Sequence, residues 1–347
     1  MIVIKTPAKI IIFGEHFIVA KGSQAILTTV GLDTTCTIGN VNDKDFHVSF
    51  KSATFNLDVQ FSQSEAIEIF SAAQKLHEQY RKNQDIKPLK DLIKTDGNFF
   101  RAIIGFLSLK YSISTCSIKF ECKAPLGSGM GTSASIASSM IAAILKNNQI
   151  DFSKQELFNL TKTIEDLQHG SSSGADPAAI INGGLLHYEH KQNGERSFRT
   201  LKNIKNWDKD LYLVHTGPPQ ESTGEMVAIS KDFQNTNPIK FNRFLNRSNQ
   251  ICNEFIKSCD PDIFPFLNES GLMLEEIGVV SNKVIEFSKM IRSKGGAIKI
   301  AGAGGRVGDG SGLCLVIIKN KNDLKHICNQ FNFKLLNAPL MVAGIDI

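Results

Sequence analysis

The chain reads Pro125-Leu126-Gly127-Ser128-Gly129-Met130-Gly131-Thr132-Ser133-Ala134-Ser135 where a strand-like segment passes into a helix-like one. Glycines at alternate positions permit positive φ and let a bound group approach the backbone closely. The start of the following helix directs unpaired N–H groups and the positive end of its dipole into the loop. Hydroxyls at the helix start can add ligands for a phosphate or a phosphate-bound magnesium ion. The stretch therefore predicts a phosphate-binding loop, although a glycine triplet alone would favour a flexible turn.

This loop differs from the two commonest nucleotide-binding motifs. The chain has no G-x-x-x-x-G-K-S/T pattern, which excludes a Walker-type P-loop. It also has no G-x-G-x-x-G that follows a strand and precedes an acidic residue about twenty positions further on. A Rossmann dinucleotide fold is therefore excluded as well.

The segments around the loop alternate between strand-like and helix-like patterns. Strand-like patterns cover residues 3–12 (two short strands around a bend), 25–38, 116–122, 180–188 and 340–347. Helix-like spacing covers residues 62–80, 132–144 and 153–167, with a capping box predicted at Ser153 and Glu156. We interpret the basic, Pro-containing residues 81–94 as surface. Because strands often follow one another directly, the order favours an α+β fold over regular βαβ winding.

Length and composition describe an ordinary globular protein of two domains. The 347 residues are 42% hydrophobic and 21% charged, and at this length a single hydrophobic core has usually stopped growing. The polar stretch 190–209 is the expected junction. It divides the chain into an N-terminal domain over residues 1–200 and a C-terminal domain over residues 201–347.

Charge and cysteine usage argue against several classes of protein. The formal net charge is +5, but Lys and Arg are dispersed among Asp and Glu, which disfavours nucleic-acid binding. The seven cysteines include no C-x-x-C pair and lie mostly in apolar runs, which favours a reducing compartment. Lys5 and Lys9 interrupt what would have to be the apolar core of a signal sequence, and no apolar stretch reaches membrane-spanning length. We therefore expect a cytoplasmic protein.

Lys9 lies among apolar residues of a predicted strand. Burying an ammonium group without a partner costs several kcal/mol. A carboxylate should therefore face Lys9, unless the side chain points outward from an edge strand.

Two further segments are rich in small residues. Residues 302–312 contain six glycines and are either a long mobile hairpin loop or a second segment that approaches a ligand. Glu165 is followed by the dense polar run 169–177, which is either a surface loop or a site that holds an acidic group. Asp176 precedes Pro177 and is expected to be extended.

Together these segments resemble the motifs of the GHMP kinase superfamily. Residues 7–16 resemble P-G-K-hydrophobic-F-G-E-H, with Ala8 in place of Gly, and residues 125–134 resemble P-x-G-x-G-L-G-S-S-A. Residues 169–176 resemble H-G-x-P-S-G-V/I-D, with Ser172 where Pro is usual, and residues 299–305 match K-L/I-T/S-G-A-G-G. Within the superfamily the motifs are most similar to those of the mevalonate kinase family.

Two positions depart from the superfamily pattern. Residues 306–311 intervene where the glycine segment normally continues directly into a strand. Glu221 precedes the Ser222-Thr223 pair where some relatives carry a basic residue, which disfavours an acceptor that already bears a phosphate.

The resemblance implies a fold, a reaction and its ligands. The fold would combine an N-terminal domain like domain 2 of ribosomal protein S5 with a ferredoxin-like C-terminal domain, with ATP and acceptor in the cleft between them. ATP and Mg²⁺ would be the cofactors, and the 5-hydroxyl of mevalonate the favoured acceptor, in isoprenoid precursor biosynthesis. The resemblance implies no nucleic-acid or membrane partner, and it allows a homodimer because many relatives are dimers.

The resemblance also assigns roles by position. Asp176 would be the base or orienter of the acceptor hydroxyl, and Lys9 would pair with it beside the transferring phosphoryl group. Ser133 and Glu165 would hold magnesium. The acceptor would be contacted by Glu15, His16, Gly174, Thr223 and Ala303. The nucleotide would be contacted by Pro125, Gly127, Ser128, Gly129, Gly131, Thr132, Ser133, Ala134, Gly302, Gly304 and Gly305.

Two kinds of alternative compete with this interpretation. The same machinery could act on phosphomevalonate, a sugar or homoserine, although residues 17–19 lack the acid that galactokinases usually carry there. A catalytically silent relative could bind a ligand without reacting, although an inactive descendant would be free to lose Lys9, Ser133, Glu165 or Asp176.

Overall fold

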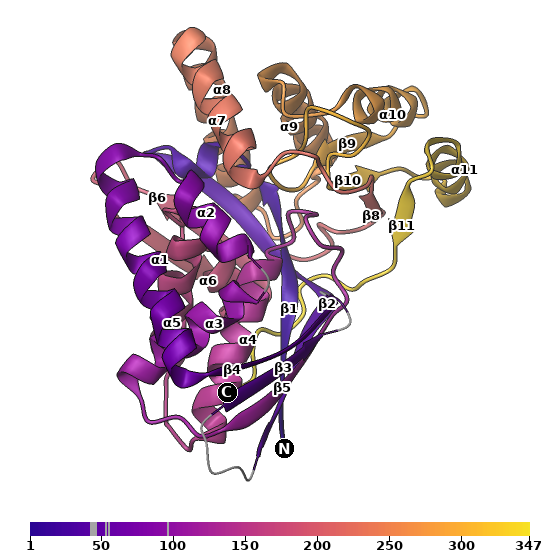
Figure 1. The fold of residues 1–347 in the computed structure, drawn as a ribbon. Helices are drawn as coiled ribbons and strands as arrows, with labels where there is room; N and C mark the ends of the chain where they lie inside the picture. Colours follow the sequence, from indigo (N-terminus) through magenta and orange to yellow (C-terminus); the bar gives the residue numbers. More distant parts are fainter. Residues whose placement is uncertain (42–46, 53, 55, 96) are drawn as a thin grey trace.

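The computed structural model describes residues 1–347 except 42–46, 53, 55 and 96. Within this part of the chain, a seven-stranded sheet organises the N-terminal half and a four-stranded sheet the C-terminal half (Figure 1). Helices accompany both sheets, and most strand pairs are antiparallel, as the α+β interpretation predicts.

The larger sheet has the strand order β4-β3-β5-β2-β6-β7, and β1 pairs with β2. Its strands are β1 (Ile2–Phe13), β2 (Ser23–Asn40), β3 (His47–Ser52), β4 (Leu57–Ser62), β5 (Cys116–Cys122), β6 (Leu185–His190) and β7 (Arg196–Thr200). The prediction of two short strands near the N-terminus is wrong. β1 is one strand with an irregularity between Thr6 and Ala8, which lets pairing with β2 continue past Pro7.

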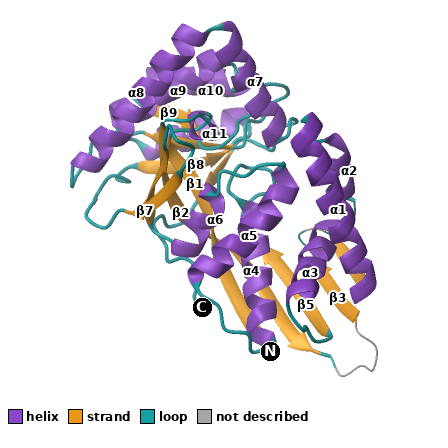
Figure 2. Ribbon diagram, turned by 90° about the vertical axis from the view of Figure 1, so that its left-hand side faces the viewer, coloured by secondary structure: helices purple, strands orange, loops and turns teal. Residues whose placement is uncertain are grey.

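Helices cover one face of the larger sheet (Figure 2). They are α1 (Gln63–Asn83), α2 (Lys87–Lys94), α3 (Asn98–Lys110), α4 (Thr132–Asn147), α5 (Lys154–His169) and α6 (Ala175–Asn182). The capping box predicted at Ser153 and Glu156 is confirmed at the start of α5. Residues 81–94 are more than surface, because α2 buries Leu89 and Ile93 in the core.

Two expectations around Asp176 are wrong. Residues 175–182 form α6, so the strand after it begins only at Leu185. Pro177 lies in the first turn of α6, where its missing N–H costs no hydrogen bond. Asp176 is therefore helical instead of extended.

The smaller sheet has the order β11-β8-β10-β9. Its strands are β8 (Leu211–His215), β9 (Ala297–Ile300), β10 (Leu313–Ile317) and β11 (Lys334–Leu336). Its helices are α7 (Thr223–Thr236), α8 (Pro238–Lys257), α9 (Phe264–Ile277), α10 (Asn282–Ser293) and α11 (Lys321–Phe331). Instead of the strand expected over 340–347, the final residues make isolated bridges to the N-terminal half, at Val30 and Gly183.

The end of β1 anchors the two halves to each other. Phe13 packs edge-on against Phe255 of α8 and Phe266 of α9, with ring centroids 5.8 and 6.3 Å apart. Ile10 and Ile12 belong to the same buried cluster as the strands of the smaller sheet. The segment that carries Lys9 is therefore held by both halves of the protein. None of the helices in the described part of the chain combines the length and apolar character that crossing a membrane requires.

Candidate active site

A cavity of about 230 Å³ brings several of the predicted segments together between the two halves. The phosphate loop contributes residues 127–129, α5 contributes His169, and the start of α7 contributes residues 222–224. The second glycine segment contributes Ala303 and Gly304. The two glycine segments touch, because a Cβ atom on Gly129 would lie only 3.1 Å from the Cα atom of Gly302. Ala303 and Gly304 are therefore part of the cavity wall, and Gly302 packs against the phosphate loop.

Lys9 and Asp176 form an ion pair beside the phosphate loop. The Lys9 Nζ to Asp176 Oδ1 distance is 2.9 Å, and the side chains are 5% and 32% exposed. The Lys9 N–H donates to the Met130 carbonyl at 3.0 Å. A Cβ atom on Gly131 would lie 2.8 Å from Lys9 Cγ and 3.4 Å from Asp176 Oδ2, so only glycine fits over the pair. The prediction that a carboxylate faces Lys9 is confirmed.

Glu165 lies next to this pair with an unsatisfied oxygen. Its side chain is 2% exposed, and among the described residues its Oε1 atom has no hydrogen-bond partner. Burial, and then the negative charge of Asp176, raise the pKa of Glu165 to about 8, whereas a hydrogen bond with Ser133 lowers it. Oxygen atoms of carboxylates and hydroxyls are the ligands that Mg²⁺ prefers. Glu165 and Ser133 therefore fit a magnesium ion, which would restore the ionised form of Glu165.

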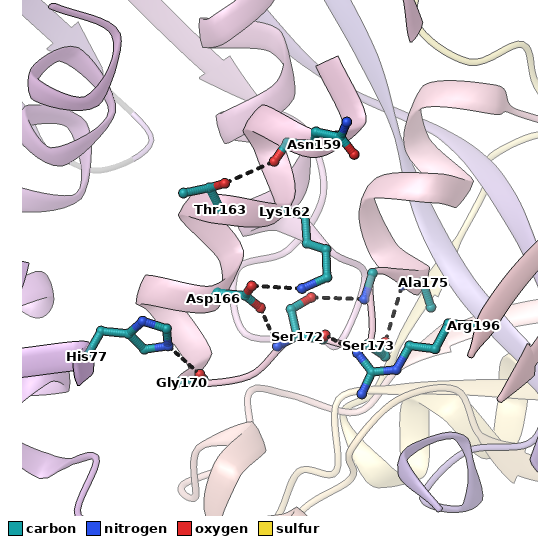
Figure 3. Close-up of polar contacts among 11 residues, drawn as sticks. His77, Asn159, Lys162, Thr163, Asp166, Gly170, Ser172, Ser173, Ala175 and Arg196 are labelled. Atoms are coloured by element: carbon teal, nitrogen blue, oxygen red, sulfur yellow. Dashed lines mark hydrogen bonds and ion pairs between the residues drawn. The ribbon is translucent and has the colours of Figure 1, made fainter. Parts of the chain in front are cut away.

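A polar network holds the loop that leads to Asp176 (Figure 3). Asp166 accepts a hydrogen bond from the Ser172 N–H at 2.7 Å and forms an ion pair with Lys162 at 2.7 Å. The Ser172 hydroxyl accepts from the Gly174 N–H at 3.1 Å, and the Ser172 carbonyl accepts from Arg196 at 2.7 Å. These contacts fix a serine where the superfamily motif usually has a rigid proline.

Sequence reasoning found this loop but missed the side chains that support it. Asp166 and Lys162 have the spacing of an ordinary exposed i,i+4 helix pair, and Arg196 lies in the polar stretch interpreted as a domain junction. Asp166 and Arg196 support the loop because the chain after α5 folds back so that Ser172 contacts both side chains. No local sequence pattern predicts these contacts.

Replacing Asp166 by Ala is expected to lower kcat by about 10- to 100-fold, because small displacements of a positioned group have effects of this size. The Ser172 N–H would lose its acceptor, and the loop carrying Asp176 would loosen. Asp166→Asn keeps an acceptor oxygen and should retain most activity. Steady-state kinetics of both variants test this, and equal losses in Ala and Asn would contradict the role of the hydrogen bond.

Glu15 and His16 connect the first motif to the C-terminal half. The Glu15 carboxylate contacts the ammonium group of Lys299 on β9, and both side chains are almost fully buried, at 2% and 0% exposed. The His16 Nε2–H donates to the Ala303 carbonyl at 2.9 Å, since a carbonyl can only accept. Lys299 opens the closing sequence motif, but no pattern in the sequence identifies Glu15 as its partner.

The predicted acceptor residues are only partly brought together. Thr223 and Ala303 line the cavity beside the phosphate loop, whereas His16 lines a second cavity of about 720 Å³. Gly174 faces the rings of Phe158 and Phe198, and Glu15 faces Lys299. Of the predicted nucleotide contacts, Gly127, Ser128, Gly129 and Gly304 line the first cavity. The roles of all these residues toward ligands stay predictions.

The two departures from the superfamily pattern contact each other. Glu221 Oε1 accepts hydrogen bonds from the N–H groups of Arg306 and Val307, at 3.1 and 2.8 Å. The acidic residue therefore fixes the start of the inserted loop. A basic residue at position 221 could not accept these two hydrogen bonds.

Acidification is expected to destabilise the protein through His16. Burial lowers the pKa of His16 from 6.5 to about 4. Between these pH values His16 binds a proton in the unfolded chain but not in the folded protein. The free energy of unfolding therefore decreases as pH falls from about 6.5 toward 4. His16→Gln cannot titrate and can still donate to Ala303. Thermal unfolding is measured at several pH values. The unfolding temperature of His16→Gln relative to that of wild type should rise as pH falls, and a difference that does not change with pH would contradict this.

Comparisons with known proteins agree with the geometry. The family model of the GHMP kinases N terminal domain matches residues 98–184, which include the phosphate loop, Glu165 and Asp176. The mevalonate kinase of Thermococcus onnurineus is 26% identical over 319 residues, covering 86% of this chain and 85% of that protein. The chain is therefore similar to the GHMP kinases over residues 98–184 and to mevalonate kinases over most of its length. The family-model match and the mevalonate kinase relatives indicate an ATP-dependent kinase.

Solved structures share its two-domain fold. The crystal structure of the Methanococcus jannaschii mevalonate kinase has a TM-score of 0.76 at 20% identity and covers 98% of both chains. The L. major mevalonate kinase in complex with R-mevalonate has a TM-score of 0.69 at 19% identity, covering 99% of this chain and 96% of that one. The GHMP kinase fold that the motifs imply is thereby confirmed.

Proposed function

We propose that this protein is a mevalonate kinase, which transfers the γ-phosphoryl group of MgATP to the 5-hydroxyl of mevalonate. The ion pair of Lys9 and Asp176, beside the phosphate loop and next to Glu165, is the observation that carries the proposal. Mevalonate is the favoured acceptor because the relatives reported above are mevalonate kinases that align over most of their length. The opening motif supports the same acceptor.

In this mechanism Asp176 orients the acceptor hydroxyl and receives its proton. The acceptor oxygen forms a bond to the γ-phosphorus while the bond from that phosphorus to the β,γ-bridging oxygen breaks, and ADP leaves. Lys9 pairs with the Asp176 carboxylate at 2.9 Å and places positive charge where the transferring group becomes more negative. Asp176 remains partly exposed, so an acceptor can reach its second oxygen.

The phosphate loop and the second glycine segment hold the nucleotide. Backbone N–H groups around residues 127–133 and the N-terminus of α4 bind phosphate oxygens. Ser133 and Glu165 hold Mg²⁺, which when bound neutralises charge on the phosphate chain. Little covalent chemistry is required of the protein, because phosphoryl transfer depends mainly on position and charge.

Other parts of the proposal rest on the sequence. We place the domain boundary at residue 200, although residues 339–345 return to contact the N-terminal half. A cytoplasmic location is proposed from the cysteine usage. The homodimer is proposed from the resemblance alone.

One assay tests the acceptor. Purified protein with MgATP is incubated with mevalonate, 5-phosphomevalonate, galactose or homoserine, and ADP release is measured. Turnover with mevalonate alone is the expected result. Turnover with another acceptor and none with mevalonate would replace the acceptor while keeping the kinase, and no turnover with any of them would favour the catalytically silent relative.

A further inference from the structure

Helix α2 places two lysines at the cavity that contains the phosphate loop. Lys90 and Lys94 both line the cavity, one helical turn apart on the same face of α2. Leu89 and Ile93, which are 0% and 4% exposed, pack into the core and hold the helix in this orientation. The position of the ammonium groups is therefore built into the fold.

Lys90 reaches across the cavity to the other half of the protein. Its Nζ atom donates to the Ser222 hydroxyl, at the N-cap of α7, over 3.3 Å. A Cβ atom on Gly224 would lie 2.7 Å from the same nitrogen, so this part of α7 leaves room for Lys90. Lys90 and His169 line the same cavity.

Neither ammonium group forms an ion pair within the described residues. No carboxylate there lies within 4.0 Å of Lys90 or Lys94. Glu225 is their electrostatic partner at longer range, because hydrogen bonds with Ser222, and then the charges of Lys90 and Lys94, lower the pKa of its carboxyl group. Glu221 lines the same cavity. Its Oε1 accepts hydrogen bonds from the N–H groups of Arg306 and Val307, whereas its Oε2 has no hydrogen-bond partner among the described residues. The Glu225 carboxylate is bonded to the hydroxyl of Ser222 at 2.6 Å. Two cations opposite a loop built to bind phosphate are therefore available to an anionic ligand.

We infer that Lys90 binds the phosphate chain of the nucleotide, with Lys94 beside it, and so supplies the lysine contact that a Walker motif would have provided. This inference rests on the proposed kinase function. Lys9 is already paired with Asp176, and the phosphate loop offers only uncharged N–H and hydroxyl donors. A charge-assisted hydrogen bond from Lys90 strengthens binding of the phosphates and leaves the nucleoside unaffected.

Direct binding tests the inference without turnover. ATP, ADP and adenosine are titrated calorimetrically, with Mg²⁺ and without acceptor, into wild type, Lys90→Ala and Lys90→Arg. Lys87→Ala is the matched control, since Lys87 is an exposed lysine on the same helix that does not line the cavity. Lys90→Ala is expected to weaken the binding of ATP and ADP about 10- to 100-fold, which is the effect of losing a hydrogen bond to a charged group. Lys87→Ala, Lys90→Arg and the binding of adenosine should change less than about twofold.

Each result bears on a different statement. If Lys90→Ala binds ATP as tightly as wild type, Lys90 makes no phosphate contact. If Lys90→Ala weakens adenosine as much as ATP, the lysine shapes the site instead of contacting phosphate, and the inference is wrong. If wild type itself binds no ATP, the proposed function fails first.

Discussion

Asp176→Asn is expected to lower kcat by about two to four orders of magnitude while ATP affinity stays nearly constant, the effect of removing a positioned acid-base group. Asparagine has nearly the same shape but cannot receive the acceptor proton. It also removes the negative charge that pairs with Lys9 at 2.9 Å. Turnover is measured with saturating mevalonate and MgATP, and ATP affinity by titration without acceptor.

A matched substitution separates chemistry from loop structure in this experiment. Asp166→Asn changes the same functional group at the other end of the loop, where it should preserve the hydrogen bond to the Ser172 N–H. A selective loss in Asp176→Asn would support the assignment. Near wild-type turnover in Asp176→Asn would refute the assignment of Asp176. It would also refute the proposed mechanism, which is built on the ion pair of Lys9 and Asp176.

Lys299→Met is expected to reduce the free energy of unfolding by about 3 to 5 kcal/mol, because it leaves a buried carboxylate without its cation. Lys299 and Glu15 are 0% and 2% exposed, and they come from different halves of the protein. Lys299 Nζ also donates to the Ile11 carbonyl at 3.5 Å, so the substitution removes a second contact. Urea unfolding measures the loss.

Two further variants identify charge as the cause. In Glu15→Gln/Lys299→Met, no net charge remains buried, so the double variant should recover much of the stability lost in Lys299→Met. Lys51 and Asp58 form an exposed ion pair, with side chains 70% and 74% exposed. Lys51→Met breaks this pair and should lower the free energy of unfolding by less than about 1 kcal/mol. A double variant as unstable as Lys299→Met would point to lost packing instead of the unpaired charge.

Several features of the site could be read from local sequence. The phosphate loop was predictable because positive φ at alternate positions requires glycine, and Gly127, Gly129 and Gly131 all adopt it. The start of α5 was predictable because Ser153 and Glu156 satisfy the N-terminal donors of the helix within a single turn. Lys9 was recognisable because an ammonium group among apolar strand residues needs a partner.

The identity of each partner depends on the tertiary structure. Lys9 meets Asp176 because Asp176 lies in helix α6, whereas Pro177 after it predicts an extended residue. Glu15 meets Lys299 because the end of β1 is packed into the C-terminal half. Lys90 faces the phosphate loop because the apolar side of α2 is packed into the core. Turns and caps are set by neighbouring residues, whereas the counter-charge of a buried ion is set by which distant elements pack together.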